Sequence, residues 1–251
     1  MRFVGVIPAR YASSRLPGKP LAEIAGKPLI QWVYEQARKA CCLQQVIVAT
    51  DDERISDSVR SWGGEVMMTR SDHLSGTDRV AEVAQAVQAE AFLNLQCDEP
   101  QIAPETICCV CECLEQDPDV DVSTARVPIL DLESANDPHA VKVVVDSQNR
   151  ALYFSRSRIP YSQDNELYCF KHLGIYAYRR SFLLALSQER STLERLEKLE
   201  QLRWLENGVR IHVATVKEDS IGVDTREDLE RVRPLLENTA KVKLSSQGKG
   251  R

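Results

Sequence analysis

The sequence predicts an α/β fold in which a mostly parallel central sheet carries helices on both faces. Short apolar runs bounded by turn residues alternate with stretches of 3.6-residue periodicity, a pattern typical of strands joined by crossover helices. The apolar run at 91–96 leads into Asp98 and Glu99, so two carboxylates follow a buried strand at the edge where open α/β sheets bind ligands. The 251 residues, 43% of them hydrophobic, can form one sizeable core.

Each element of the first half follows from a local signal. The chain opens with an apolar run, and after a long loop Pro28 can begin a helix that places Leu29, Trp32 and Val33 on one face. A glycine pair at 63–64 ends a later helical stretch. The expected strands are 3–7, 46–49, 65–69 and 91–96, and the expected helices are 28–40, 53–62, 77–90 and 104–116.

The middle of the chain, from 121 to 178, changes character because strand-like runs follow one another without a long helix between them. We therefore expect an inserted or mixed-sheet region at about 120–180 within a single domain at 1–237. The tail at 238–251 has little to bury and is expected to be disordered. The remaining expected elements are strands at 122–127, 140–145, 173–178 and 209–216 and helices at 193–206 and 225–236.

Composition argues against several classes of partner. The net charge of −5, with both signs spread along the chain, provides no broad basic field for nucleic acid phosphates. No run approaches a membrane span and no signal peptide is recognisable, so we expect a cytoplasmic protein without membrane insertion. The eight cysteines then fit reduced thiols, and Cys108, Cys109, Cys111 and Cys113 are expected to act as small apolar helix residues rather than as zinc ligands.

The loop at 8–20 concentrates positive charge directly after the first strand. It carries Arg10, Arg15 and Lys19 together with two serines, and such a set can hold a triphosphate. The alternative is an ordinary solvated loop. Its Gly–Lys pair is followed by Pro20 and lacks the upstream glycine of a Walker A motif, so a phosphate loop of the ATPase type is not expected.

Two motifs in this loop resemble the amino-terminal signature of 3-deoxy-manno-octulosonate cytidylyltransferases, also called CMP-Kdo synthetases: Ile7-Pro8-Ala9-Arg10 and Ser14-Arg15-Leu16-Pro17-Gly18-Lys19-Pro20-Leu21. The resemblance continues in order at 49–51, 68–70, 75–79, 94–100, 151–156, 172–176, 199–203 and 222–225. It implies a Rossmann-like nucleotidyltransferase fold and a homodimer built through the smaller mixed-sheet region. It also implies transfer of CMP from CTP to the anomeric hydroxyl of Kdo, an acidic eight-carbon sugar, as a cytoplasmic step toward lipopolysaccharide.

The resemblance also assigns roles to residues. Lys19, Asp98 and Asp224 are implied to be catalytic, and the two aspartates are implied ligands of Mg²⁺, which commonly binds through one or two carboxylates plus substrate phosphate. The implied CTP-binding residues are Pro8, Ala9, Arg10, Ser14, Arg15, Lys19, Thr50, Arg70, Ser75 and Gly76. The implied sugar-binding residues are Arg79, Gln96, Arg156, His172, Tyr176, Glu200 and Gln201.

Several of these patterns also have a purely structural interpretation. Without the resemblance, Asp224-Thr225 is more typical of a helix cap and His172 of a core histidine with a satisfied hydrogen bond, and Ser75-Gly76-Thr77 fits a capped turn equally well. Cys97 stands where the family usually has glycine, so its side chain could crowd the metal or the sugar.

In the expected mechanism, the anomeric hydroxyl of Kdo attacks the α-phosphorus of CTP in line, and no covalent enzyme intermediate is needed. Three alternatives stay open: 8-amino-Kdo as the acceptor, sialic acid as the acceptor, and a non-catalytic nucleotide-binding regulator. The sugar-facing segments favour Kdo over sialic acid. The presence of Lys19, Asp98 and Asp224 argues against the regulator.

Overall fold

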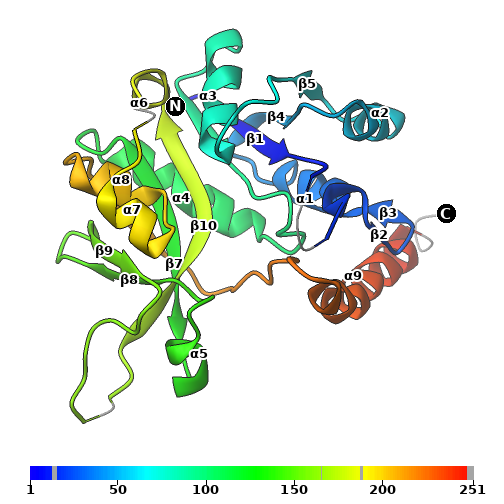
Figure 1. Ribbon diagram of the computed structural model, residues 1–251. Coiled ribbons are helices and arrows are strands. Elements are labelled where there is room, and N and C mark those ends of the chain that lie inside the picture. The colour runs from blue at the N-terminus through cyan, green and yellow to red at the C-terminus, as the bar shows by residue number, and fades with distance from the viewer. Residues whose placement is uncertain (13–15, 165, 187–188, 248–251) are drawn as a thin grey trace.

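The computed structural model describes residues 1–12, 16–164, 166–186 and 189–247, and its centre is one nine-stranded sheet (Figure 1). The strands are β1 Phe3–Ala9, β4 Leu43–Thr50, β5 Val66–Met68, β6 Ala91–Asn94, β7 Val122–Ile129, β8 Lys142–Val145, β9 Ala151–Ser155, β10 Cys169–Arg179 and β11 Ile211–Thr215. Their order is β11-β7-β10-β6-β1-β4-β5, with β8 paired to β10 and β9 paired to β8.

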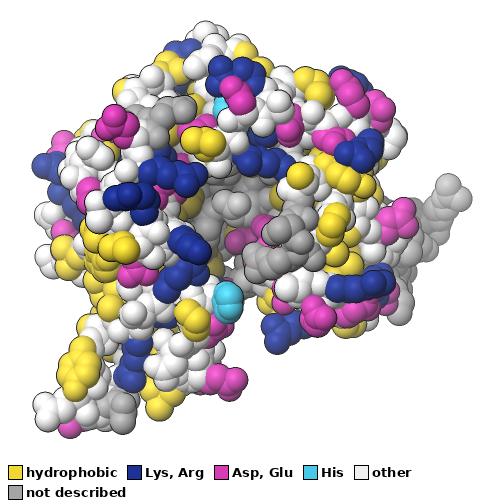
Figure 2. Space-filling view, viewed as in Figure 1, with side chains coloured by type: hydrophobic (Ala, Val, Ile, Leu, Met, Phe, Trp, Pro, Cys, Tyr) yellow, Lys and Arg dark blue, Asp and Glu magenta, His cyan; other side chains and the backbone are white. Residues whose placement is uncertain are grey.

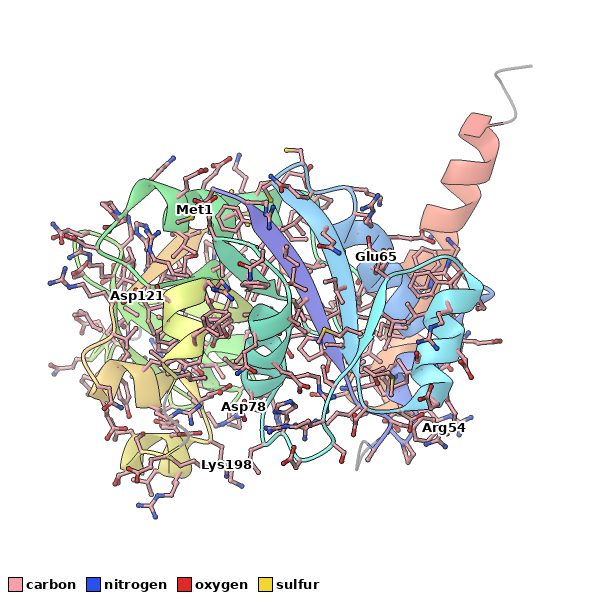
Figure 3. The ribbon with its side chains drawn as sticks, turned by 90° about the horizontal axis from the view of Figure 1, so that it is seen from above. Met1, Arg54, Glu65, Asp78, Asp121 and Lys198 are labelled. Carbon is pink, nitrogen blue, oxygen red and sulfur yellow. The ribbon has the colours of Figure 1, made fainter. Side chains whose placement is uncertain are left out.

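The sheet has a parallel half and a mixed half. β1 lies between β4 and β6, and β4 pairs with β5, all in parallel. β10 runs antiparallel to β6 and β7, while β11 is parallel to β7. The parallel strands therefore all end at one edge, which Figure 3 shows between Arg54 and Asp78, opposite Met1 and Glu65.

Helices cover both faces of the sheet and bury apolar residues against it. Their bounds are α1 Leu29–Ala37, α2 Glu53–Ser61, α3 Gly76–Ala86, α4 Pro104–Gln116, α5 Leu132–Asn136, α6 Arg180–Leu184, α7 Thr192–Glu197, α8 Gln201–Glu206 and α9 Arg226–Gln247. One core joins α1, α2 and α4 to the sheet, and a second core joins α3, α6 and α8 to its other face. A third cluster packs α9 against α1 and the short hairpin of β2 (Glu23–Ile24) and β3 (Lys27–Pro28).

The predicted fold class is confirmed, and the strands of the first half lie where expected. α4 occupies the expected 104–116, and Pro104 lies in its first turn, where proline is favoured. None of the helices in the described part of the chain combines the length and apolar character that crossing a lipid bilayer requires.

Two expectations differ from the structure, and a third is narrowed by it. The expected helix at 193–206 is two helices, α7 and α8, because Lys198 adopts a left-handed conformation with φ 55° between them. Of the two alternatives expected at about 120–180, the structure has the mixed sheet rather than an insertion, since β7 and β10 belong to the central sheet and only β8 and β9 extend beyond it. The closing helix begins at Arg226 and continues to Gln247, so most of the tail expected to be disordered is helical.

Candidate active site

A lysine held between two aspartates marks the carboxyl edge of the parallel strands. Lys19 follows Gly18, whose φ of 70° allows the tight turn into a short 3₁₀ helix at Lys19–Leu21. The lysine side chain is largely buried, and its Nζ donates to Asp98 Oδ2 at 2.5 Å and to Asp224 Oδ1 at 3.1 Å. Three residues from distant segments, which the family resemblance implies to be catalytic, therefore meet at one point.

Backbone contacts hold the two aspartates in place. Asp98 follows β6, and its carbonyl accepts a hydrogen bond from Val223 N at 2.9 Å. Asp228 N donates to Thr225 Oγ1 at 3.1 Å and Thr225 N donates to Asp228 Oδ2 at 2.9 Å, so Thr225 caps α9. The cap that the sequence allows at Asp224-Thr225 thus belongs to Thr225, while the Asp224 carboxylate contacts Lys19.

Lys19 keeps its positive charge in this setting. Burial by itself lowers the pKa of the Lys19 ammonium, but the attraction of Asp98 and the hydrogen bonds to Asp98 and Asp224 outweigh burial and raise that pKa above its usual value. A triphosphate that arrives here therefore meets a lysine that is already charged.

The two aspartates fit Mg²⁺ as part of a shared ligand set. Both carboxylates reach one nitrogen atom, so their oxygens lie close enough together to reach one cation. Within the described residues, no group of three or more His, Cys, Asp or Glu side chains could hold a metal ion. Mg²⁺ commonly takes one or two carboxylates and completes its oxygen ligands from phosphate and water. This donor set therefore suits an ion that binds together with a triphosphate.

Beside these charges lies a cavity of about 1570 Å³, which Figure 2 shows as a hollow with acidic atoms near its centre. Asp98 and Asp224 line the cavity. So do six of the seven predicted sugar-binding residues, namely Gln96, Arg156, His172, Tyr176, Glu200 and Gln201. Amide, guanidinium, imidazole, phenol and carboxylate groups thus line one space, which suits a ligand with several hydroxyls and a carboxylate.

Backbone carbonyls orient two of these side chains. Gln96 Nε2 donates to Gly174 O at 3.0 Å, which leaves the amide oxygen as an acceptor. Arg156 Nε donates to Glu197 O at 2.8 Å, and Arg156 Nη1 donates to Pro138 O at 3.0 Å. The Arg156 guanidinium is therefore fixed at the cavity wall.

His172 is neutral, and its neighbours select one tautomer. Thr124 Oγ1 donates its single proton to Ile175 O at 2.7 Å, so the 2.9 Å contact between Thr124 Oγ1 and His172 Nε2 is assigned as a bond donated by Nε2. Burial lowers the pKa of His172 to about 3. The imidazole therefore has an unprotonated Nδ1 at neutral pH, which can accept a hydrogen bond from a hydroxyl.

Glu200 connects the cavity to the N-terminus of α3. Its carboxylate accepts hydrogen bonds from Ser75 Oγ at 3.0 Å, Thr77 Oγ1 at 2.9 Å and Arg203 Nη2 at 2.8 Å. Burial raises the pKa of Glu200 above its usual value despite these donors. Ser75 also caps α3 through reciprocal bonds with Asp78, so the capped turn that the sequence allows is present and contacts a cavity residue.

Four of the predicted CTP-binding residues gather where β1 and β4 end. Pro8 and Ala9 close β1, Thr50 closes β4 and is fully buried, and Gly76 lies against Pro8. A methyl group added at Gly76 would come within 3.6 Å of Pro8 Cγ. The N-terminus of α3, whose backbone amides favour anions, therefore adjoins the carboxyl end of β1.

The arginines among the predicted CTP-binding residues do not all lie at this place. Arg10 follows β1 and donates to His73 O. Arg70 stands apart, because 67% of its side chain is exposed and its Nε contacts Asp72 at 3.2 Å. Ser14 and Arg15 lie outside the described residues.

Arg79 is the predicted sugar-binding residue that does not line the cavity. Its guanidinium is fully buried, where it contacts Asp51 Oδ1 at 3.0 Å and Thr69 Oγ1 at 2.5 Å. In this position the side chain is enclosed by protein and does not line the cavity. It instead holds the segments that follow β4 and β5.

The structure accommodates a cysteine side chain at position 97, where the family usually has glycine. Among the described residues other than glycine, only Ala25, Asn149 and Lys198 have a positive φ, so the backbone at Cys97 suits a residue with a side chain. Cys97 packs against the main core. Burial, followed by the nearby Asp98 charge, raises the pKa of its thiol to about 12, so the thiol stays protonated.

A local signal in the sequence marks only one of the residues that orient the cavity side chains. Thr124 selects the tautomer of His172, Glu197 anchors Arg156, and the buried Lys142 donates from Nζ to Arg156 O at 2.6 Å. These contacts join segments 48, 41 and 14 residues apart in the chain. A charged residue within an expected strand, Lys142, was the one visible sign.

Sequence comparison shows extensive similarity to known enzymes. The family model described as cytidylyltransferase matches residues 4–211. The chain is 49% identical over 243 residues to the 3-deoxy-manno-octulosonate cytidylyltransferase of Syntrophotalea carbinolica, an alignment that covers 92% of this chain and 97% of that protein. It is 51% identical over 237 residues to the enzyme of the same name from Solibacter usitatus, covering 93% and 94%.

Comparison with solved structures agrees. A structure of CMP:2-keto-3-deoxy-manno-octonic acid synthetase complexed with CTP is 47% identical, has a TM-score of 0.91, and covers 95% of this chain and 100% of that one. The 4-diphosphocytidyl-2C-methyl-D-erythritol synthase of Anaerococcus prevotii has a TM-score of 0.63 at 13% identity, covering 94% and 99%, and shares the fold alone.

Proposed function

The chain belongs to the cytidylyltransferase family, and from that premise we propose that it transfers CMP from CTP to 3-deoxy-D-manno-octulosonate (Kdo), releasing pyrophosphate and forming CMP-Kdo. The observation that carries this proposal is the convergence of Lys19, Asp98 and Asp224 beside a polar cavity. A charged group of residues that can bind a triphosphate with its metal ion thus lies next to a polar cavity that can bind a sugar acid.

The reaction is an in-line exchange at the α-phosphorus. The anomeric oxygen of Kdo bonds to phosphorus, the bond from phosphorus to the β-phosphate oxygen breaks, and pyrophosphate leaves. Lys19 is placed to offset negative charge that develops on the phosphates, and its raised pKa keeps it cationic.

We propose Mg²⁺ as the cofactor, held by Asp98 and Asp224 together with oxygens of the triphosphate. When bound, the ion supplies positive charge that offsets the charge of the phosphates. Lys19 contacts both aspartates, so the chain itself keeps the two carboxylates close together before the nucleotide binds.

Different cavity side chains would recognise different chemical groups of Kdo. Arg156 offers a fork of donors to the sugar carboxylate, while His172 Nδ1 and the amide oxygen of Gln96 accept from hydroxyls. Glu200 lines the same cavity and contacts Ser75 and Thr77 at the start of α3. The nucleotide and sugar sides therefore share one carboxylate.

We propose that the active form is a cytoplasmic homodimer that supplies lipopolysaccharide synthesis. Large hydrophobic side chains stand exposed along 130–168, at 86% for Leu130, 61% for Leu152, 88% for Tyr161 and 66% for Tyr168. A second copy placed over β8 and β9 would cover them. All eight cysteines are free, which supports a reducing compartment.

Pyrophosphate release from CTP and Mg²⁺ tests the function directly, with Kdo, 8-amino-Kdo and sialic acid offered separately. We expect release with Kdo. Release with one of the other acids alone would retain the chemistry and change the acceptor, whereas no release with any of the three would favour a nucleotide-binding protein without catalytic activity.

A further inference from the structure

Four cysteines from two segments form a cluster at the edge of the sheet opposite the active site. Cys41 and Cys42 lie in the turn before β4, and Cys108 and Cys111 lie one turn apart on α4. Leu43, which begins β4, pairs with Phe3 at the start of β1. The cluster is therefore at the amino edge, which Met1 and Glu65 mark in Figure 3, about 25 Å along β4 from the carboxyl edge.

The thiols of the cluster contact one another. Cys41 Sγ and Cys108 Sγ are 3.9 Å apart, with Cys41 exposed and Cys108 partly buried. Cys42 hydrogen-bonds through its sulfur to Cys111 and to Cys108, and these bonds lower the pKa of Cys42 to about 7. Burial raises the pKa of Cys108 to about 12. A readily ionised thiol thus lies against one that holds its proton.

We propose that Cys41 and Cys108 form an oxidation site, at which a low-molecular-weight disulfide converts the two thiols into a bond between the turn before β4 and α4. The sulfurs must close from 3.9 Å to about 2.05 Å. The exposed position of Cys41 in a turn allows this movement and gives the small disulfide access.

The reaction consists of two thiol–disulfide exchanges. The Cys41 thiol loses its proton to solvent, and the resulting thiolate attacks one sulfur of the small disulfide, forms a mixed disulfide and releases one small thiolate, which takes up a proton from solvent. The Cys108 sulfur then attacks the Cys41 sulfur and expels the second small thiol. Cys42, which is hydrogen-bonded to Cys108, accepts the Cys108 proton and passes it to the departing thiolate. Two protein thiols are oxidised, and one small disulfide is reduced to two thiols.

The Cys41–Cys108 disulfide would stabilise the folded chain without changing the active site. Cys41 and Cys108 are 67 positions apart, and closing a loop of this length restricts the unfolded chain. We expect Tm to rise by about 5–15 °C on oxidation. Pyrophosphate release should stay within about twofold of the reduced enzyme, because the cluster lies a strand length from Lys19.

The test treats the full-length chain with oxidised glutathione and follows intact mass, cross-linked peptides and Tm. The wild type should lose two hydrogens, yield a peptide that joins Cys41 to Cys108, and gain Tm. Cys41→Ser and Cys108→Ser should gain no Tm, and Cys108→Ser should retain glutathione on Cys41. Cys42→Ser should form the bond about tenfold more slowly.

The matched control is Cys109→Ser, one position further along α4, which should form the bond as the wild type does. A wild type that takes up glutathione without cross-linking would overturn the proposal. So would a bond between any other pair of cysteines, or a gain of Tm in Cys108→Ser equal to that of the wild type.

Discussion

The two halves of the sheet build their parts of the site by different means. In the parallel half, the loops after β1 and β6 carry opposite charges, and Lys19 contacts Asp98 at 2.5 Å and also reaches Asp224, from the segment between β11 and α9, at 3.1 Å. In the mixed half, the cavity side chains come from β10, from the segment after β9 and from the start of α8, and neighbouring groups hold them in place, as Thr124 holds His172. In the proposed function, charged groups act on the nucleotide, whereas side chains held by fixed hydrogen bonds recognise the sugar.

This contrast predicts different consequences of mutation. Removing a charge in the parallel half should affect turnover, because in the proposed reaction that charge acts on the reacting phosphates. Removing a cavity group in the mixed half should affect sugar binding or the pH dependence of stability, because those groups are fixed before substrate arrives.

The largest effect is expected from Asp98→Asn. The amide keeps the size of the side chain but removes the charge that lies 2.5 Å from Lys19 Nζ and that we assign to Mg²⁺. We expect kcat to fall by about 10³-fold or more, with Tm within a few degrees of wild type because Lys19 retains Asp224. Pyrophosphate release and thermal unfolding measure the two quantities, with exposed Asp57→Asn as the control. Full activity in Asp98→Asn would show that the Asp98 carboxylate is not required for catalysis.

A smaller, selective effect is expected from Arg156→Ala. The variant loses the guanidinium fixed by Glu197 O and Pro138 O at the cavity wall. We expect KM for Kdo to rise by about 10- to 100-fold, the range for losing a charged hydrogen-bond donor, while KM for CTP stays unchanged. Initial rates measured with each substrate varied in turn give both constants, and Arg158→Ala, whose side chain donates to Glu166 O, is the control. An equal rise in KM for Kdo and in KM for CTP would contradict the assignment of Arg156 to sugar binding alone.

The neutral His172 predicts a pH dependence of stability. Its native pKa of about 3 lies below the value of about 6.5 for an unfolded histidine, so the unfolded state binds more protons at acidic pH. The contribution of His172 is therefore complete above about pH 6.5 and decreases as the pH falls toward 3. At pH 5 the loss should be about 2 kcal/mol of the free energy of unfolding.

Urea unfolding at pH 7 and pH 5 measures this loss. His172→Gln keeps an N–H donor for Thr124 but cannot titrate, so its stability should change less between the two pH values, by about 2 kcal/mol. Exposed His139→Gln should behave as the wild type does. The same pH dependence in His172→Gln and wild type would show that His172 titrates as an ordinary histidine.

The same division explains how much could be predicted from the sequence. A charged loop after an apolar run is a local pattern, so Lys19 and Asp98 could be identified together with the strands that lead to them. In the mixed half, the tautomer of His172 depends on Thr124, 48 residues earlier, and the break between α7 and α8 depends on Lys198 in a left-handed conformation. Such long-range and conformational facts leave no periodicity in the sequence.

The smallest effect on activity is expected at Cys97, where the sequence departs from the family between Gln96 of the sugar side and Asp98 of the nucleotide side. Cys97→Gly removes packing against the core and increases the freedom of the unfolded chain. We expect the free energy of unfolding to fall by about 1–2 kcal/mol and kcat to change less than about threefold.

Cys97→Ala is the matched control, because it removes the sulfur but keeps the β-carbon. Urea unfolding and pyrophosphate release on both variants separate lost packing from added backbone freedom. If Cys97→Gly alone gained tenfold or more in kcat, the cysteine would be crowding the bound substrates. Position 97 would then need glycine for full catalysis, although the substrate-free chain accommodates the cysteine side chain there.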